Sequence, residues 1–277
     1  RMIGYNNIPL QVLALPIMAK QHKHSLEDQI GRYLVNQGCF EVINNPFTDF
    51  VGKEAIAVDN PLDKQRAMLR TCLLNSIRTN IAYNQNRQKD SIKFFEFSDI
   101  YKTSGTERRF ALAVSGRVNK NAKEFNAQLD YGYLKGLINS ICTDILKAQP
   151  TYELADKRGF DFYEALTING TKFGGLGKVS KETIDSKVKT PVFACELTID
   201  DLEVPDNIFV PISDFPASYR DLSFSLSDTS KIVDILKIVN VGKDDELFKE
   251  SFIFDFFQNK KLNLLKVGFR FKFQASN

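Results

Sequence analysis

The stretch Ile92-Lys93-Phe94-Phe95-Glu96-Phe97 decides the class of fold, because it predicts a β-strand over 92–101. Aromatic and β-branched residues are enriched in strands. Further strands are predicted at 40–43, 109–117, 162–168, 171–179 and 192–199. Short helices lie between these runs of neighbouring strands. That order is typical of an α+β fold with a largely antiparallel sheet.

Three helices are predicted in this part of the chain. Ser25 can cap the first, the acidic residue Asp28 favours its N-terminus, and Gly38 is suited to end it. The second is predicted over 68–86, and the third begins near Asp130. Each carries an apolar stripe at helical spacing, which indicates an amphipathic helix.

A second module follows a break at Val204-Pro205-Asp206-Asn207. It predicts a β–α–β–β order, with elements at 221–226, 229–240, 251–258 and 265–273. This order is the opening of a βαββαβ, ferredoxin-like unit. Because the sequence stops at Asn277, we expect the module to be truncated at its C-terminus. We therefore expect a connector at 1–16, a first domain at 17–206 and a second domain at 207–277.

Composition narrows the class of protein. Of the 277 residues 43% are apolar, which is enough for ordinary cores, and the net charge is only +3. Such a charge neither demands nor excludes a nucleic-acid partner, so any basic surface must be local. The four cysteines are far apart and form no C-x-x-C pair, which indicates reduced, mostly buried thiols in a cytosolic protein. No apolar run reaches the ~20 residues that a membrane span requires.

Two motifs invite a chemical interpretation. Gly174-Gly175-Leu176-Gly177-Lys178 resembles a phosphate loop, but Lys172 and Val179 stand where a Walker loop needs Gly and Ser or Thr. We predict instead a strand or hairpin whose glycines permit close backbone packing. His22 and His24 are the only histidines, and without a nearby third ligand they are predicted to be surface residues. The sequence predicts no catalytic residue and no metal site.

The last predicted strand alternates strictly, from Val267 to Gln274. Val267 and its Phe neighbours would face the helices, and the opposite face would carry Arg270 and Lys272 beside serines of the first strand. An open basic sheet face is suited to the RNA backbone. Its own aromatic residues point inward, however, and the module has nearly neutral charge. Two interpretations stay open here: an RNA-binding surface and a merely solvated sheet face.

Seven segments spread along nearly the whole chain form a recognisable set: RMIGYNNIP at 1–9, NPL at 60–62, MLRTCLL at 68–74, FFEFSDIY at 94–101, GLGKV at 175–179, PVFACEL at 191–197 and FPASYRD at 215–221. Together they resemble the beta subunit of bacterial-type phenylalanyl-tRNA synthetases. Met2 and Ile3 depart slightly from the family's pattern. The segments occur in the family's order, which makes the resemblance specific.

The resemblance implies a heterotetramer of two alpha and two beta chains, a class II synthetase that joins phenylalanine to its tRNA with ATP and magnesium. Catalysis would reside in the alpha subunit. This chain would hold an inactive, degenerate copy of the class II catalytic domain, which packs against alpha, and an anticodon-binding module. Candidate tRNA(Phe)-binding residues are then Arg220, Lys266, Arg270 and Lys272. The family's magnesium-binding acids and editing site would lie before Arg1, so no cofactor is expected in this chain.

The residues support the expected lack of catalysis. A working class II site holds ATP with arginines, whose fork is suited to phosphate. No arginine lies between Arg87 and Arg108, or between Gly159 and Tyr219, where two of these arginines would stand. Without them the charge of the transition state would lack its main stabiliser.

Two other classes of function remain as alternatives. A freestanding RNA-binding or scaffold protein with a synthetase-like fold would not co-purify with an alpha chain. A self-sufficient ligase or adenylating enzyme would catalyse ATP–pyrophosphate exchange by itself.

Overall fold

The computed structural model describes residue 7 and residues 25–276, apart from 53, 120, 124–125, 207–208, 210, 227, 229, 242–245 and 260–263. The predicted connector at 1–16, except residue 7, lies outside the described residues, as do His22 and His24. The chain divides into two compact units, 1–205 and 206–277.

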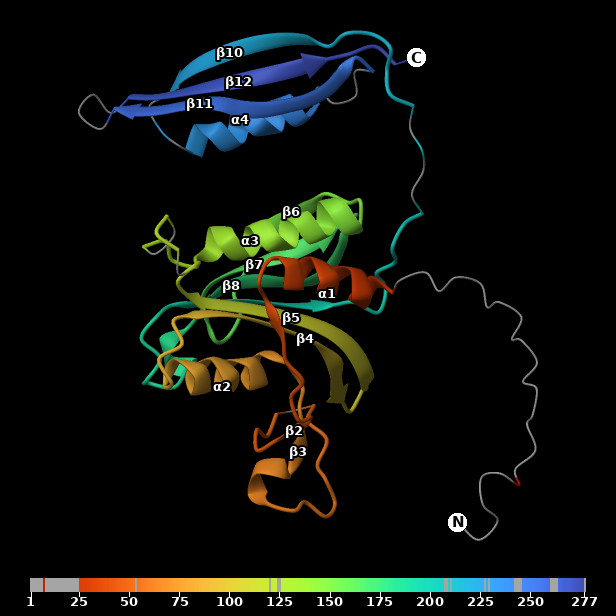
Figure 1. The fold of residues 1–277 in the computed structure, drawn as a ribbon, viewed down its shortest axis with the longest axis vertical. Coiled ribbons are helices and arrows are strands. Elements are labelled where there is room, and N and C mark those ends of the chain that lie inside the picture. The colour runs from red at the N-terminus through yellow and green to blue at the C-terminus, as the bar shows by residue number, and fades with distance from the viewer. Residues whose placement is uncertain are drawn as a thin grey trace. The chain divides into compact units, whose positions relative to one another are not determined.

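The first unit is built on a seven-stranded sheet (Figure 1). In spatial order its strands are β1 (Phe40–Glu41), β4 (Ser91–Lys102), β5 (Gly105–Gly116), β9 (Val192–Thr198), β8 (Thr171–Val179), β7 (Phe160–Ile168) and β6 (Pro150–Leu154). Only β1 and β4 pair in parallel, and the other neighbours are antiparallel. The predicted α+β class with a largely antiparallel sheet is therefore confirmed.

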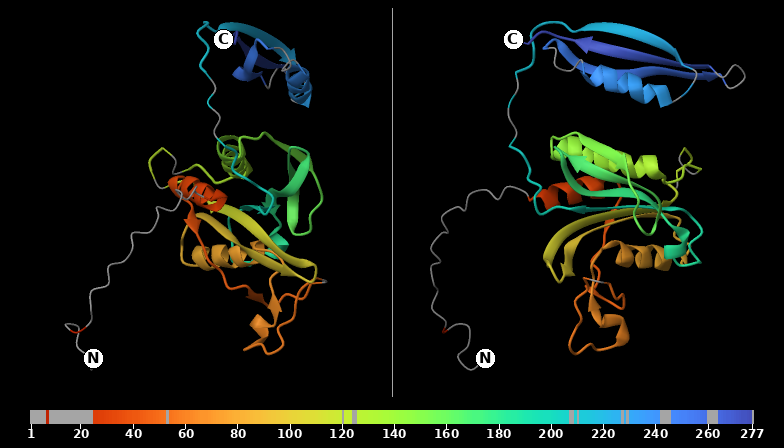
Figure 2. Two further views of the ribbon diagram at one scale, coloured as in Figure 1. Left: turned by 90° about the vertical axis from the view of Figure 1, so that its right-hand side faces the viewer. Right: turned by 180° about the vertical axis from the view of Figure 1, so that it is seen from behind.

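Helices cover both faces of this sheet. Helices α1 (Leu26–Asn36) and α3 (Tyr131–Ser140) lie on one face, and α2 (Leu74–Gln85) lies on the other (Figures 1 and 2). A π-helical turn over Ile141–Ile145 continues α3. Strand β5 supplies both cores, because Phe110 and Leu112 pack on the α1 and α3 side while Ala111 and Ala113 pack on the α2 side.

Two helix starts follow from local capping, as the sequence predicts. The Ser25 hydroxyl accepts the Asp28 backbone N–H, and the Asp28 carboxylate accepts the Ser25 N–H in return. The Asp130 carboxylate accepts the Tyr133 N–H at the start of α3. Gly38 follows α1 with a φ of 74°, a left-handed conformation that glycine adopts without steric cost.

Helix α2 begins six residues later than the predicted 68–86. Met68 and Leu69 form a short strand, β3, that pairs with β2 (Phe47–Thr48). This long-range pairing overrides the helical periodicity of the segment. The structure also has an edge strand, β6, that we did not predict, and its first residue is Pro150, a residue confined to strand starts and edges.

The second unit has a three-stranded antiparallel sheet and one helix. Its elements are β10 (Ser218–Leu226), α4 (Ser230–Val241), β11 (Phe248–Asn259) and β12 (Leu264–Phe273), and the strand order is β10-β12-β11. The elements follow in the predicted β–α–β–β order. Ile232 and Ile235 of α4 pack on Val267 and Phe269 of β12, so the helix covers one face of the sheet.

All four cysteines are free, as predicted, and Cys39, Cys142 and Cys195 are buried. Within the described part of the chain, no helix is both long and apolar enough to cross a membrane.

Candidate functional site

The sheet face of the second unit that lies opposite α4, here called the open face, holds three of the four predicted binding residues. Lys266, Arg270 and Lys272 alternate along β12 with Leu265, Val267 and Phe269, which are buried on the α4 side. Residues that face each other in a sheet project from the same side. Tyr219 pairs with Lys272 and Asp221 pairs with Arg270, so both belong to the open face.

Arg220 lies on the other side of the sheet. It pairs with Phe271, which packs against the core under α4. Its guanidinium donates to the Ser218 hydroxyl and to the Tyr219 carbonyl, and the side chain remains exposed. The four predicted residues therefore do not share one surface.

Strand β11 gives the open face aromatic side chains that the sequence analysis missed. Phe252 pairs with Arg270, Phe257 pairs with Lys266, and the Phe254 ring centre lies 4.8 Å from the Arg270 guanidinium. These three rings are between 42% and 54% exposed. The aromatic residues of β12 do point inward, as predicted, but its neighbour supplies rings that point outward.

A β-bulge explains why the pattern of β11 is misleading. The register shifts between Ile253 and Asp255, so Phe257 rather than Phe256 lies on the open face. Uninterrupted alternation from Phe252 would have placed Phe256 there. No residue type in this run of phenylalanines signals the bulge.

The charges of the open face are partly neutralised. Arg270 donates from Nε to Asp221 Oδ1 at 2.8 Å and from Nη2 to Asp221 Oδ2 at 2.7 Å. This bidentate contact lowers the pKa of Asp221 below its ordinary value. Lys272 stands opposite Glu250 of β11. The open face is therefore an aromatic surface bordered by cations rather than a strongly basic one, an arrangement that can stack bases.

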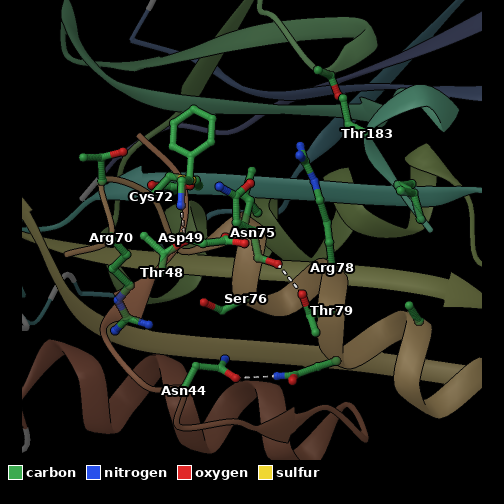
Figure 3. A pocket seen from close by; sticks show the side chains of 18 of the residues that line it. Asn44, Thr48, Asp49, Arg70, Cys72, Asn75, Ser76, Arg78, Thr79 and Thr183 are labelled. Carbon is green, nitrogen blue, oxygen red and sulfur yellow. Dashed lines mark hydrogen bonds between the residues drawn. The ribbon is translucent and has the colours of Figure 1, made fainter. Parts of the chain in front are cut away.

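A second candidate site, here called the α2 pocket, lies in the first unit on the side of the sheet that α2 covers. Its cavity has a volume of about 1020 Å³ and is lined by parts of α2, the segment before β2 and the loops around Gly159 and Thr183 (Figure 3). Most of the side chains labelled in Figure 3 are polar. The pocket is assembled from segments more than 100 residues apart in the sequence.

One wall of the α2 pocket is a buried polar network. Arg70 Nη1 donates to Glu96 Oε1 at 2.9 Å, and the two side chains are 4% and 1% exposed. Asn44 donates to Glu96 Oε2 at 2.8 Å and accepts from Asn80 at 2.8 Å (Figure 3). Because Arg70 is engaged by Glu96, this arginine is structural.

The opposite wall gathers cations around one carboxylate. Arg78, Arg109 and Lys157 are electrostatic neighbours of Glu196. Burial raises the pKa of Glu196, and the backbone N–H groups of Leu73 and Leu74 donate to its carboxylate. Burial also lowers the pKa values of Lys157 and Arg78. Arg109 is ion-paired with Glu107.

The two strands where ATP-binding arginines would stand in a working class II site do not contribute cations to this wall. On β4, Lys93 donates to the Tyr133 hydroxyl and the Gln37 carbonyl on the α3 side. On β8, the glycines allow close strand packing, as predicted: a Cβ at Gly175 would lie 2.1 Å from the Glu164 carbonyl oxygen. The cations of the pocket come from α2, β5 and the loop before β7. These residues share no sequence motif, because only the folded structure brings them close together.

Comparison with known proteins points to one family. Residues 8–199 match the family model described as the phenylalanyl tRNA synthetase beta chain CLM domain. The chain is 28% identical to the phenylalanine–tRNA ligase beta subunit of Mesoplasma florum, over 86% of this chain and 33% of that protein. It is 24% identical to that of Dehalococcoides mccartyi, over 99% of this chain and 37% of that protein. The chain thus spans about a third of the length of these relatives.

Among solved structures, a pyrrolysyl-tRNA synthetase from Desulfitobacterium hafniense aligns with a TM-score of 0.49 and 12% identity, over 63% of this chain and 65% of that chain. The family model, in contrast, covers the larger part of the chain in sequence. The chain belongs to the family of phenylalanyl-tRNA synthetase beta chain CLM domains.

Proposed function

We propose that the chain acts as part of the beta subunit of a cytoplasmic phenylalanine–tRNA ligase. It supports the catalytic alpha subunit of a tetramer with two chains of each kind, and it binds tRNA(Phe) during aminoacylation driven by ATP and magnesium. The observation that carries this proposal is the family match over residues 8–199, joined by relatives that align with up to 99% of the chain.

In this proposal the first unit is a class II catalytic-like domain that performs no catalysis. Two observations support that role. The glycines of β8 pack against neighbouring strands and leave no loop for phosphate. Arg70, which lines the α2 pocket, is bound to Glu96 rather than free to hold a nucleotide. The ATP and magnesium of the reaction would then bind to the alpha subunit.

The second unit, in this proposal, is a ferredoxin-like anticodon-binding module that uses its open face. Support comes from the exposed rings of Phe252, Phe254 and Phe257 beside Lys266 and Lys272. Base stacking on aromatic side chains contributes about 1–3 kcal/mol per base, and cations along the same surface attract the backbone.

Co-expression tests the subunit role. The 277-residue chain is produced with a tagged alpha subunit of the same enzyme, and the molar mass of the purified complex is measured by light scattering. We expect a stable complex with alpha, and no ATP–pyrophosphate exchange by the chain alone. A chain that never co-purifies with alpha would favour a freestanding RNA-binding protein, and exchange by the isolated chain would favour a self-sufficient ligase.

Salt titrations of tRNA binding test the open face. Lys266→Ala and Lys272→Ala should each reduce the slope of log K against log salt concentration by about 1. Phe254→Ala should weaken binding at every salt concentration and leave the slope unchanged, because it removes stacking and no charge. Arg270→Ala should change the slope less than Lys272→Ala, since Asp221 already neutralises Arg270.

Arg220→Ala is the matched control, because Arg220 is an exposed cation on the opposite side of the same sheet. We expect it to have a smaller effect than Lys272→Ala. If Arg220→Ala reduces the slope as much as Lys272→Ala does, RNA does not bind through the open face.

A further inference from the structure

The cationic wall of the α2 pocket contains two charges that form no direct ion pair among the described residues, although both interact electrostatically with Glu196. Among the described residues, neither Arg78 nor Lys157 has a carboxylate oxygen within 4.0 Å. Arg78 Nε is buried and has no hydrogen-bond partner. A buried donor without a partner is unfavourable, and most such groups in proteins are satisfied by a side chain, by water or by a ligand.

These two cations lie close to the same ring. The Arg78 guanidinium is 5.9 Å and Lys157 Nζ is 6.0 Å from the centre of the Phe160 ring. A Cβ at the neighbouring Gly159 would lie 3.5 Å from Arg78 Nη2 and 3.6 Å from Thr183 Cγ2. Figure 3 shows Arg78 extending from α2 toward Thr183. Two positive charges therefore converge at one end of the cavity.

The N-terminus of α2 lies at the same place, and Glu196 accepts the backbone N–H groups of Leu73 and Leu74 there. Its N-cap residue is Leu73, which provides no side-chain hydrogen bond to the first turn. Leu74, Asn75 and Ser76 of that turn line the cavity. The N-terminus of a helix carries partial positive charge and favours anions.

The carboxylates that line the pocket form no direct ion pair with Arg78 or Lys157 among the described residues. Glu196 already accepts the N–H groups of Leu73 and Leu74, and burial favours its neutral form. Asp49 and Asp185 also line the cavity, but neither forms an ion pair with Arg78 or Lys157 among the described residues. This end of the pocket therefore has an excess of positive charge around an unsatisfied N–H group.

We propose that the α2 pocket binds a small molecule that carries a phosphate group, held by Arg78 and Lys157 at the N-terminus of α2. A guanidinium and an ammonium together provide bidentate and point-charge contacts to phosphate oxygens. The side chains of Asn75 and Ser76, which also line the cavity, can contact the rest of the ligand.

Calorimetric titration of the 277-residue chain at low salt tests this site. The probes are inorganic pyrophosphate, AMP and adenosine, the last lacking phosphate. We expect saturable binding of pyrophosphate, AMP or both, and much weaker binding of adenosine. Binding of pyrophosphate alone would indicate free phosphate as the ligand class, whereas tighter binding of AMP would indicate an organic phosphate.

Variants locate the site. Arg78→Ala and Lys157→Ala are each expected to weaken binding of the phosphate probe about tenfold or more, since each removes a charge-assisted contact. Arg78→Lys keeps the charge but loses the fork, and should fall between Arg78→Ala and the unaltered chain. Arg87→Ala is the control, because Arg87 follows the other end of α2 and stacks on Tyr83.

Three results would overturn the proposal. The first is the absence of saturable binding by any phosphate probe to the unaltered chain, a measurement that requires no variant to fold. The second is equal weakening by Arg87→Ala and Arg78→Ala, which would indicate non-specific attraction. The third is adenosine binding as tightly as AMP.

Discussion

The buried Arg70–Glu96 ion pair is expected to be a sensitive point for the stability of the first unit. It joins three segments of the fold. Glu96 belongs to β4 and accepts the Asn44 backbone N–H at 3.2 Å and the Asn44 side-chain amide at 2.8 Å. Arg70, between β3 and α2, also donates from Nε to the Asp99 carbonyl at 3.2 Å. Removing one partner of the pair would leave the other charge buried.

Arg70→Met is therefore expected to lower the free energy of unfolding by roughly 3–5 kcal/mol. Adding Glu96→Leu removes the carboxylate that has lost its partner. Replacing both partners of a buried ion pair with apolar residues often leaves the stability nearly unchanged. The recovery should be incomplete by about 1 kcal/mol, because Asn44 loses its acceptor. The double variant is thus predicted to be more stable than the Arg70→Met variant.

Urea denaturation monitored by circular dichroism measures these differences. With a slope of about 1–3 kcal/mol per molar urea, a loss of roughly 4 kcal/mol moves the midpoint by about 2 M. Arg66→Met is the control, because Arg66 forms an exposed 3.6 Å ion pair with Asp63. That variant should cost no more than about 1 kcal/mol. The reasoning is refuted if Arg70→Met lowers the free energy of unfolding as little as the control does. It is also refuted if the loss of the double variant equals the sum of the losses measured for Arg70→Met and Glu96→Leu separately.

Three further predictions concern packing and titration. Gly177→Ala should lower the melting temperature, because the new Cβ would lie 2.1 Å from the Phe162 carbonyl oxygen and overpacking costs about 1–3 kcal/mol. Gly136→Ala should raise the melting temperature by increasing helix propensity, worth up to about 1 kcal/mol, since nothing lies within 4 Å of its Cβ position in α3; in thermal melts, a rise for Gly177→Ala would contradict the first argument and a fall for Gly136→Ala would contradict the second. Because burial raises the pKa of Glu196 above its ordinary value of 4.5, the folded state binds this proton more tightly than the unfolded state. The contribution of Glu196 to stability is then present below pH 4.5 and is lost as pH rises through the raised pKa, so Glu196→Gln should flatten that part of the stability profile in urea titrations; identical profiles for both proteins would argue against it.

Local signals in the sequence predicted much of the fold. Ser25 and Asp28 mark the start of α1 through contacts within one helical turn, and the aromatic and β-branched residues of 92–97 mark β4. The glycines of β8 were likewise interpreted correctly, since their need for close backbone approach is a local property. Such features depend on a few neighbouring residues, which is why a single sequence reveals them.

Features that depend on distant pairing could not be predicted in the same way. Met68 and Leu69 have a helical pattern, yet they pair with Phe47 and Thr48. The bulge after Ile253 moves Phe257 to the open face, and it is fixed by the register of β11 against β12 rather than by residue type. The sequence argument against RNA binding, that the aromatic residues point inward, considered β12 alone and therefore missed the rings of its neighbour.

The α2 pocket shows that anion binding and catalysis with ATP are two separate properties, although the sequence argument treated them as one. Arginines missing from two motif positions argue against the ATP clamp of a class II catalytic site. They do not argue against an anion site, because Arg78 and Lys157 reach the pocket from α2 and from the loop before β7, 79 residues apart in the sequence. Binding accelerates a reaction only when it favours the transition state over the ground state. A pocket that holds phosphate tightly is therefore compatible with a domain that catalyses nothing.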